Sequence, residues 1–72
     1  MKISYDGDVD AAYLQLSKKK PNGAVELSEG VILHTTEDHE IVGIEILDAS
    51  TKFPVKTLYS YELVEPRARS AG

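Results

Sequence analysis

The sequence contains no cysteine and no tryptophan, and only one phenylalanine and one methionine. Without cysteine the chain can form no disulfide, no thiolate metal site and no cysteine nucleophile. It also has no run of eighteen apolar residues, the length that a membrane-spanning helix requires. Its first residues become polar and acidic within six positions, where a secretory signal would need an apolar stretch. We therefore expect a small soluble protein with a cytoplasmic location.

Positive charge is scarce, because 8 lysines and arginines face 12 aspartates and glutamates and give a net charge of −4. Proteins that bind nucleic acids non-specifically gain affinity by neutralising phosphates, so we expect no nucleic-acid partner. We expect no membrane partner either, because the chain lacks an apolar run long enough to span a bilayer. The two basic clusters, Lys18–Lys20 and the pair Arg67 and Arg69, are interpreted as a solvated loop and a loose tail. An acidic protein of this size remains compatible with a small basic protein partner, as an antitoxin-like accessory protein would have.

The length of the chain limits how much core it can bury. A chain of 72 residues, 42% of them hydrophobic, forms one domain and has little interior. Small domains usually supplement such a core with disulfides, a metal or association, and the first is excluded here. We therefore predict a homo-oligomer, most simply a dimer, formed by a domain at residues 1–64 and followed by a disordered tail at 65–72.

A period of two in hydrophobicity dominates the chain and predicts strands. Residues 2–17 alternate on both sides of an acidic turn and are interpreted as a hairpin. Residues 25–47 form a second hairpin-linked group that begins after Pro21-Asn22-Gly23, a turn-forming sequence. The expected fold class is mostly β: a small antiparallel sheet of four or five strands built from hairpins.

The run at residues 41–47 is the most apolar and β-branched in the chain and is predicted to be the central strand. Gly43 within it leaves room for a close neighbour, and Gly30 is expected to mark a bulge or bend. Asp48 or Ser50 is expected to cap a short helical turn near residues 49–53, which Pro54 ends.

The sequence pattern of residues 55–63 matches two kinds of secondary structure, a strand well and a helix in part. Their content of Thr, Tyr and Val favours a strand, which we expect either to close the sheet or to cross to a partner subunit.

Three aspartates at alternate positions, Asp6, Asp8 and Asp10, are the cluster that most resembles a cation site. A calcium-binding EF-hand loop would need glycine at its sixth position and glutamate at its twelfth, where this chain has Ala11 and Ser17. We therefore interpret the three carboxylates as a solvated hairpin turn, and assign no metal.

Glu45 is unusual because it lies among isoleucines in the predicted central strand, where desolvation would raise a carboxyl pKa. The simpler interpretation is that it reaches solvent or pairs with a cation on a neighbouring strand. An alternative hypothesis joins Glu45 with the three aspartates in one ligand or metal site. His34 and His39, five residues apart across a turn, are expected to point away from each other.

No arrangement of residues predicts catalysis. The serines lack a nucleophile-elbow motif, and no glycine-rich loop suited to phosphates is present. We assign no catalytic residue and no cofactor, and favour a non-catalytic interaction or oligomerisation module over an enzyme. The expected contact residues lie on the central strand and in the C-terminal segment: Ile41, Gly43, Glu45, Leu47, Tyr59 and Tyr61.

Two stretches resemble a known family. The first is Tyr5-Asp6 followed by Asp10-Ala11-Ala12-Tyr13-Leu14-Gln15-Leu16-Ser17. The second is Gly30-Val31-Ile32-Leu33 followed by Ile41-Val42-Gly43-Ile44-Glu45-Ile46-Leu47-Asp48-Ala49-Ser50. Together they are similar, over about residues 2–53, to the small bacterial and archaeal family called domain of unknown function 2283. The resemblance implies no assigned activity and carries over no catalytic residue. Where members of that family commonly have an Asp-x-Asp-Gly turn, this chain has Glu37-Asp38-His39-Glu40.

Overall fold

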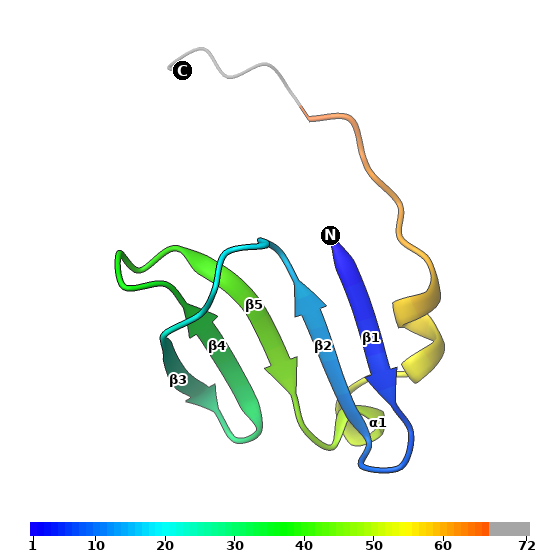
Figure 1. Ribbon diagram of the computed structural model, residues 1–72. Helices are drawn as coiled ribbons and strands as arrows, with labels where there is room; N and C mark the ends of the chain where they lie inside the picture. The colour runs from blue at the N-terminus through cyan, green and yellow to red at the C-terminus, as the bar shows by residue number, and fades with distance from the viewer. Residues whose placement is uncertain (67–72) are drawn as a thin grey trace.

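Five strands, one short helix and one 3-10 helix make up the protein, as seen in a computed structural model that describes residues 1–66 (Figure 1). In chain order the elements are β1 (Lys2–Asp6), β2 (Ala11–Gln15), β3 (Gly23–Ser28), β4 (Val31–Thr35), β5 (Ile41–Ile46), α1 (Ala49–Lys52) and η1 (Val55–Tyr59). The mostly-β fold class with an antiparallel sheet of five strands is thereby confirmed, as is the short helix after the last strand.

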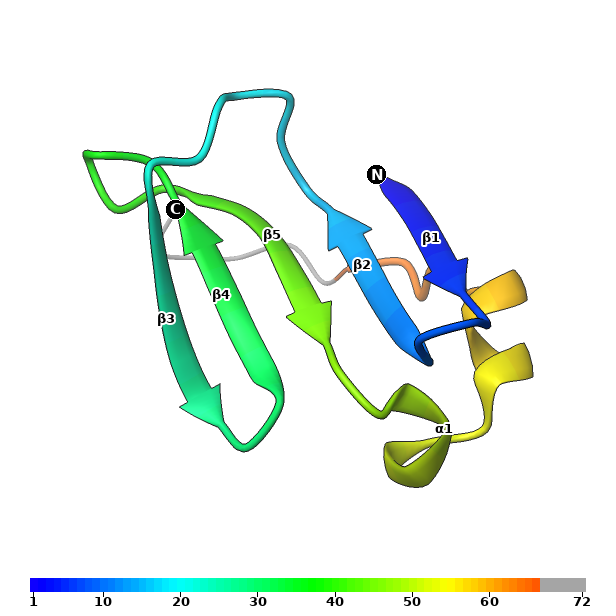
Figure 2. The same cartoon turned by 60° about the horizontal axis from the view of Figure 1, so that its bottom comes forward.

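The strand order is β1-β2-β5-β4-β3, and every neighbouring pair is antiparallel. The prediction that residues 41–47 form the central strand is confirmed, because β5 joins the β1–β2 hairpin to the β3–β4 hairpin (Figures 1 and 2). A central strand forms ladders on both edges and touches the most neighbours, which suits the β-branched residues that dominate β5.

The register sorts the side chains into two faces, since alternate residues of a strand point to opposite sides. One row of paired residues crosses all five strands and is entirely apolar: Ile3, Leu14, Ile44, Leu33 and Val25. The adjacent row on the opposite face mixes polar and apolar residues: Ser4, Tyr13, Glu45, Ile32 and Glu26. We call these two sides the apolar face and the polar face.

The interior is small. Among the described residues the buried hydrophobic side chains are Ala12, Val42 and Ala49, all of them small. The middle residues of the apolar row, Leu14 and Ile44, are only half-buried. Residues 1–66 of one chain therefore provide no second layer over much of the apolar face of the sheet.

Turns with left-handed backbone connect the elements. Gly30 has φ 75° in the β3–β4 turn, and the register of β3 shifts between Glu26 and Ser28, in agreement with the predicted bend. Asp48 stands at the N-cap of α1 with φ 52° and makes no side-chain cap, which corrects the expectation that Asp48 or Ser50 caps the helix. Ser50 instead bonds to a residue 40 positions earlier.

The prediction of a last strand at residues 55–63 is wrong. Residues 55–59 form η1, in which the amide of Thr57 donates to the carbonyl of Pro54 at 2.9 Å. From Ser60, whose backbone is extended (φ −153°, ψ 158°), residues 60–66 continue without helix or strand and are exposed throughout. The tail predicted at 65–72 lies outside the described residues from position 67 onward.

Within residues 1–66, none of the helices has the length and apolar character needed to cross a membrane.

Candidate functional site

A hydrogen-bonded cluster ties the β1–β2 turn to the start of α1. The Tyr5 hydroxyl donates to Oδ1 of Asp10 at 2.7 Å, and the Ser50 hydroxyl donates to Oδ2 of the same carboxylate at 2.6 Å. The backbone amides of Ser50 and Ala49 add bonds to Asp10 Oδ1 and to the Asp10 carbonyl, at 3.0 and 2.9 Å. Asp10 is thus the point where β1, the first turn and α1 are held together.

These bonds change the acidity of both partners. The Ser50 hydroxyl, followed by the Tyr5 hydroxyl, holds the pKa of Asp10 below its usual value of 3.8. The hydrogen bond between the Tyr5 hydroxyl and Asp10 raises the pKa of Tyr5 above 10.0, because the carboxylate favours the protonated phenol. Both pKa shifts favour the pair formed by the Asp10 carboxylate and the protonated Tyr5 hydroxyl at neutral pH. Because both carboxylate oxygens already accept hydrogen bonds, the arrangement is suited to a structural role.

A second cluster lies on the polar face. Nε2 of His34 in β4 lies 3.1 Å from Oε1 of Glu45 in β5, with side chains 25% and 34% exposed. The ring of Tyr13 in β2 meets the His34 ring edge-on at a centroid distance of 5.6 Å. Gly43 makes this contact possible, because a Cβ at that position would lie 2.5 Å from Cζ of Tyr13. The prediction that Gly43 leaves room for a close neighbour is confirmed.

This second cluster presents an imidazole oriented by a carboxylate, which is one part of a general-base site. Among the described residues, no serine or threonine hydroxyl is hydrogen-bonded to His34, so a nucleophile to activate is missing from the arrangement. The cluster therefore pairs Glu45 with the imidazole of His34 on the neighbouring strand β4, where the simpler interpretation of Glu45 expected solvent or a cation.

The four carboxylates of the alternative ligand site do not meet in one network. Asp6 accepts a bond from the amide of Asp8 at 2.9 Å, as a turn-forming aspartate does. Asp10 is bonded to Tyr5 and Ser50, while Glu45 faces His34. No group of three or more His, Cys, Asp or Glu side chains within residues 1–66 is placed to hold a metal ion.

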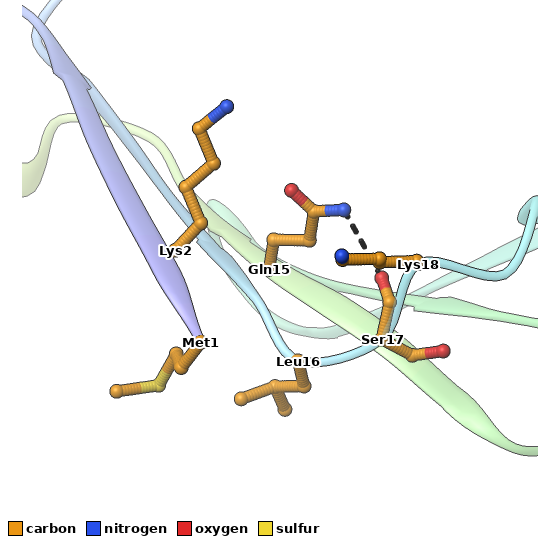
Figure 3. Close-up of a pocket in the computed structure, with 6 residues that line it drawn as sticks. All are labelled: Met1, Lys2, Gln15, Leu16, Ser17 and Lys18. Atoms are coloured by element: carbon orange, nitrogen blue, oxygen red, sulfur yellow. Dashed lines mark hydrogen bonds between the residues drawn. The ribbon is translucent and has the colours of Figure 1, made fainter.

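A hollow with a volume of about 460 Å³ lies at one end of the sheet. Its lining comes from the start of β1 and the end of β2: Met1, Lys2, Gln15, Leu16, Ser17 and Lys18. Figure 3 shows Lys2 and Gln15 on one side of the strands, and Met1 and Leu16 on the other. The hollow is open, and the two clusters described above lie outside it.

The residues expected to make contacts fall in different surroundings. Gly43 and Glu45 lie on the polar face, covered by Tyr13 and paired with His34. Ile41 begins β5 and Leu47 follows its end; they are 47% and 37% exposed, while Tyr59 and Tyr61 are 77% and 76% exposed. Their role as contact residues remains a prediction.

Two features were not anticipated from the sequence. The bond between Ser50 and Asp10 joins residues 40 positions apart, and the nearest indication was that both lie within the two family-like stretches. The pairing of His34 with Glu45 depends on the β4–β5 register, in which His34 stands opposite Gly43 and Glu45 opposite Ile32. His39, with φ 67°, lies in the following turn and is separate from this pair.

Comparisons with known proteins relate the chain to a curated protein and to a family. A protein from Methanosarcina mazei called "Putative hypoxanthine phosphoribosyltransferase" is 42% identical to this chain over 52 residues. That alignment covers 72% of this chain and 42% of the relative, so the chain spans less than half of the relative's length. No solved structure matches significantly. The model of a family described as "Protein of unknown function (DUF2283)" matches residues 2–50, the region that holds both clusters and all five strands, and the chain therefore belongs to this family.

Proposed function

We propose that the protein is a non-catalytic oligomerisation module whose apolar face binds a second copy of the chain. The observation that carries this proposal is the row of Ile3, Leu14, Ile44, Leu33 and Val25, which crosses the whole sheet and is left half-buried or exposed by the described residues. In a two-layer β protein such a row would pack on another sheet at about 10 Å. A second copy supplies that other sheet.

The size of the face supports this occupant. Five strands about 4.8 Å apart, each about five residues of 3.3 Å, give a face of about 400 Å² in projection, and the accessible area of its side chains is larger. Exposed apolar patches above a few hundred Å² usually mark interaction surfaces. Stable interfaces bury about 800 Å² per partner, which is within reach of this face and its surroundings.

The chemistry of the apolar face also favours a second copy of the chain over a basic protein as its partner. Its two rows of side chains contain no carboxylate: Tyr5, Ala12, Ile46, Val31 and Ser28 form the row beside the apolar one. A basic protein would find acidic side chains at the hairpin turns instead, and that partnership remains a prediction from the net charge. The activity named for the relative is not part of our proposal, because this chain spans only 42% of that protein.

Light scattering coupled to gel filtration tests the proposal. We expect a mass of twice 7.9 kDa at micromolar concentration. Ile3→Asp, on the apolar face of the edge strand β1, should shift the protein to a monomer. The control is Ser4→Asp, which introduces the same charge one position later, on the polar face. This variant should remain a dimer, with the circular dichroism spectrum of the wild type. A wild-type protein that is only monomeric would refute the proposal.

A further inference from the structure

The C-terminal segment, residues 60–66, carries an apolar side that nothing in the described chain covers. Tyr61 and Leu63 alternate with Ser60 and Glu62, and are 76% and 82% exposed. The backbone at Ser60 is already extended, and no proline interrupts the segment before Pro66. Alternation of apolar and polar residues in an extended segment is the pattern of a strand with one buried face. Pro66, which lacks an N–H, would end such a strand.

The sheet offers one open edge that suits such a strand. All six residues of β3 are exposed, including Val25 at 54% and Leu27 at 61%. An exposed and apolar edge strand is a template for pairing with another segment. The opposite edge, β1, has η1 beside it in both views, and Tyr59 lies close enough to Tyr5 to influence its pKa (Figures 1 and 2).

The segment cannot pair with the β3 edge of its own chain. It leaves η1 on the β1 side of the sheet, and four strand spacings of about 4.8 Å, roughly 19 Å, separate β1 from β3. Seven extended residues span about 23 Å at most, so the segment would be used up in reaching β3, with almost none left to pair. The same segment on a second copy has no such limit.

We infer that residues 60–65 add as a sixth strand to β3 of a second copy, a form of β-strand addition. Three observations support this: the segment is too short to pair with β3 of its own chain, its apolar and polar residues alternate, and the β3 edge is exposed. This strand addition rests on the proposed self-association, and in it residues 60–65 hold the two copies together. In the exchanged strand Tyr61 and Leu63 lie on the same side of the sheet as Val25, which extends the apolar face that the two copies share.

Charge sets the direction and register of the added strand. An antiparallel strand brings Glu65 toward Lys18 and Lys20, which precede β3 and form no ion pair within the described residues. A register with Leu63 opposite Val25 would place Glu62 opposite Glu26, and like charges directly opposite are unfavourable. We therefore expect Tyr61 opposite Val25, with Glu62 opposite Ala24.

A matched pair of substitutions in the full chain tests the role of the segment. Leu63→Asp places a charge on the side that faces the partner, whereas Val64→Asp places it on the other side of the same strand. Because both residues are exposed, neither change should alter the fold of one chain. We expect Leu63→Asp to weaken the dimer about tenfold or more, and Val64→Asp to leave its dissociation constant unchanged. Equal dissociation constants for the two variants would overturn the inference.

Cysteine crosslinking tests the position, since the natural chain has no cysteine to interfere. Tyr61→Cys together with Val25→Cys should give a disulfide-linked dimer on a non-reducing gel, and Tyr61→Cys with Ala24→Cys, on the opposite face of β3, should not. A disulfide within one chain, or none, would overturn strand exchange. If the wild type is dimeric in that case, the apolar face still stands as the interface; if it is monomeric, both proposals fall.

Discussion

Gly43→Ala is the substitution whose effect the structure fixes most closely. A Cβ on Gly43 would lie 2.5 Å from Cζ of Tyr13 and 2.8 Å from the carbonyl oxygen of Leu14. The Tyr13 ring can rotate away only by giving up its edge-on contact with His34. The Leu14 carbonyl belongs to the backbone of β2, which pairs with β5 in this region, so it can move only with the sheet.

The magnitude follows from two opposing effects. Forcing an extra methyl into a packed site costs about 1–3 kcal/mol, and replacing glycine in a strand gains about 0.5–1 kcal/mol. The difference between these ranges is about 0–2.5 kcal/mol, and because the Cβ meets a backbone carbonyl as well as a ring, the net loss of unfolding free energy should lie in the upper part of that range, about 1–2 kcal/mol. For a domain of this size that loss lowers the melting temperature by roughly 5–15 °C.

Thermal unfolding followed by circular dichroism, at one fixed protein concentration, measures this loss. The control is Gly23→Ala, whose Cβ would meet only Oγ1 of Thr35 at 3.4 Å, and which should change stability by about 0.5 kcal/mol or less. In a Tyr13→Ala background, Gly43→Ala should lower the unfolding free energy by less, because the added Cβ then meets the Leu14 carbonyl without the Tyr13 ring. An unchanged melting temperature for Gly43→Ala, or the same cost with and without the Tyr13 ring, would refute the reasoning.

The remaining predictions concern the Asp10 cluster and the surface. Because the folded pKa of Asp10 is lowered, its contribution to stability is present above pH 4 and is lost as the pH falls through the folded value; acid titrations of unfolding midpoints should show a smaller loss for Asp10→Asn than for wild type. Because the folded pKa of Tyr5 is raised, its contribution is complete below pH 10 and is lost at higher pH, so Tyr5→Phe should flatten the alkaline limb of the same titration. Ser50→Ala should bring the carboxyl pKa, followed by NMR, back toward 3.8, and an unchanged value would contradict the assigned cause. The ion pair of Lys19 and Glu40 is solvent-exposed, so Lys19→Ala should alter stability by about 0.5 kcal/mol or less.

The sequence alone predicted the local features of the sheet. The central position of β5 followed from its density of Ile and Val, and the room beside Gly43 followed from a glycine inside a strand. These are properties of a few neighbouring residues, so a single sequence contains them. The strands themselves followed in the same way from alternation of hydrophobicity with a period of two.

The candidate clusters could not be predicted, because each depends on residues brought together by strand register. The bond of Ser50 to Asp10 closes a loop of 40 positions, and neither residue type is unusual in a turn. His34 meets Glu45 only because β4 and β5 pair in one particular register. Residues 55–59 form η1 and not the expected strand because a turn starts at Pro54, in which the Thr57 amide bonds back to the Pro54 carbonyl, and this local turn overrides their strand propensity.

The central place of β5 in the sheet affects how the protein is made. β5 is the last strand to be synthesised, yet it supplies the partner for both β2 and β4. Until residues 41–46 leave the ribosome, the nascent chain holds only two separate hairpins, and isolated two-stranded hairpins are marginally stable in water. Translation must therefore reach β5 before either half of the sheet can be secured. Ribosome-bound chains that end before Ile41 should be sensitive to protease, and those that expose Ile46 should become resistant.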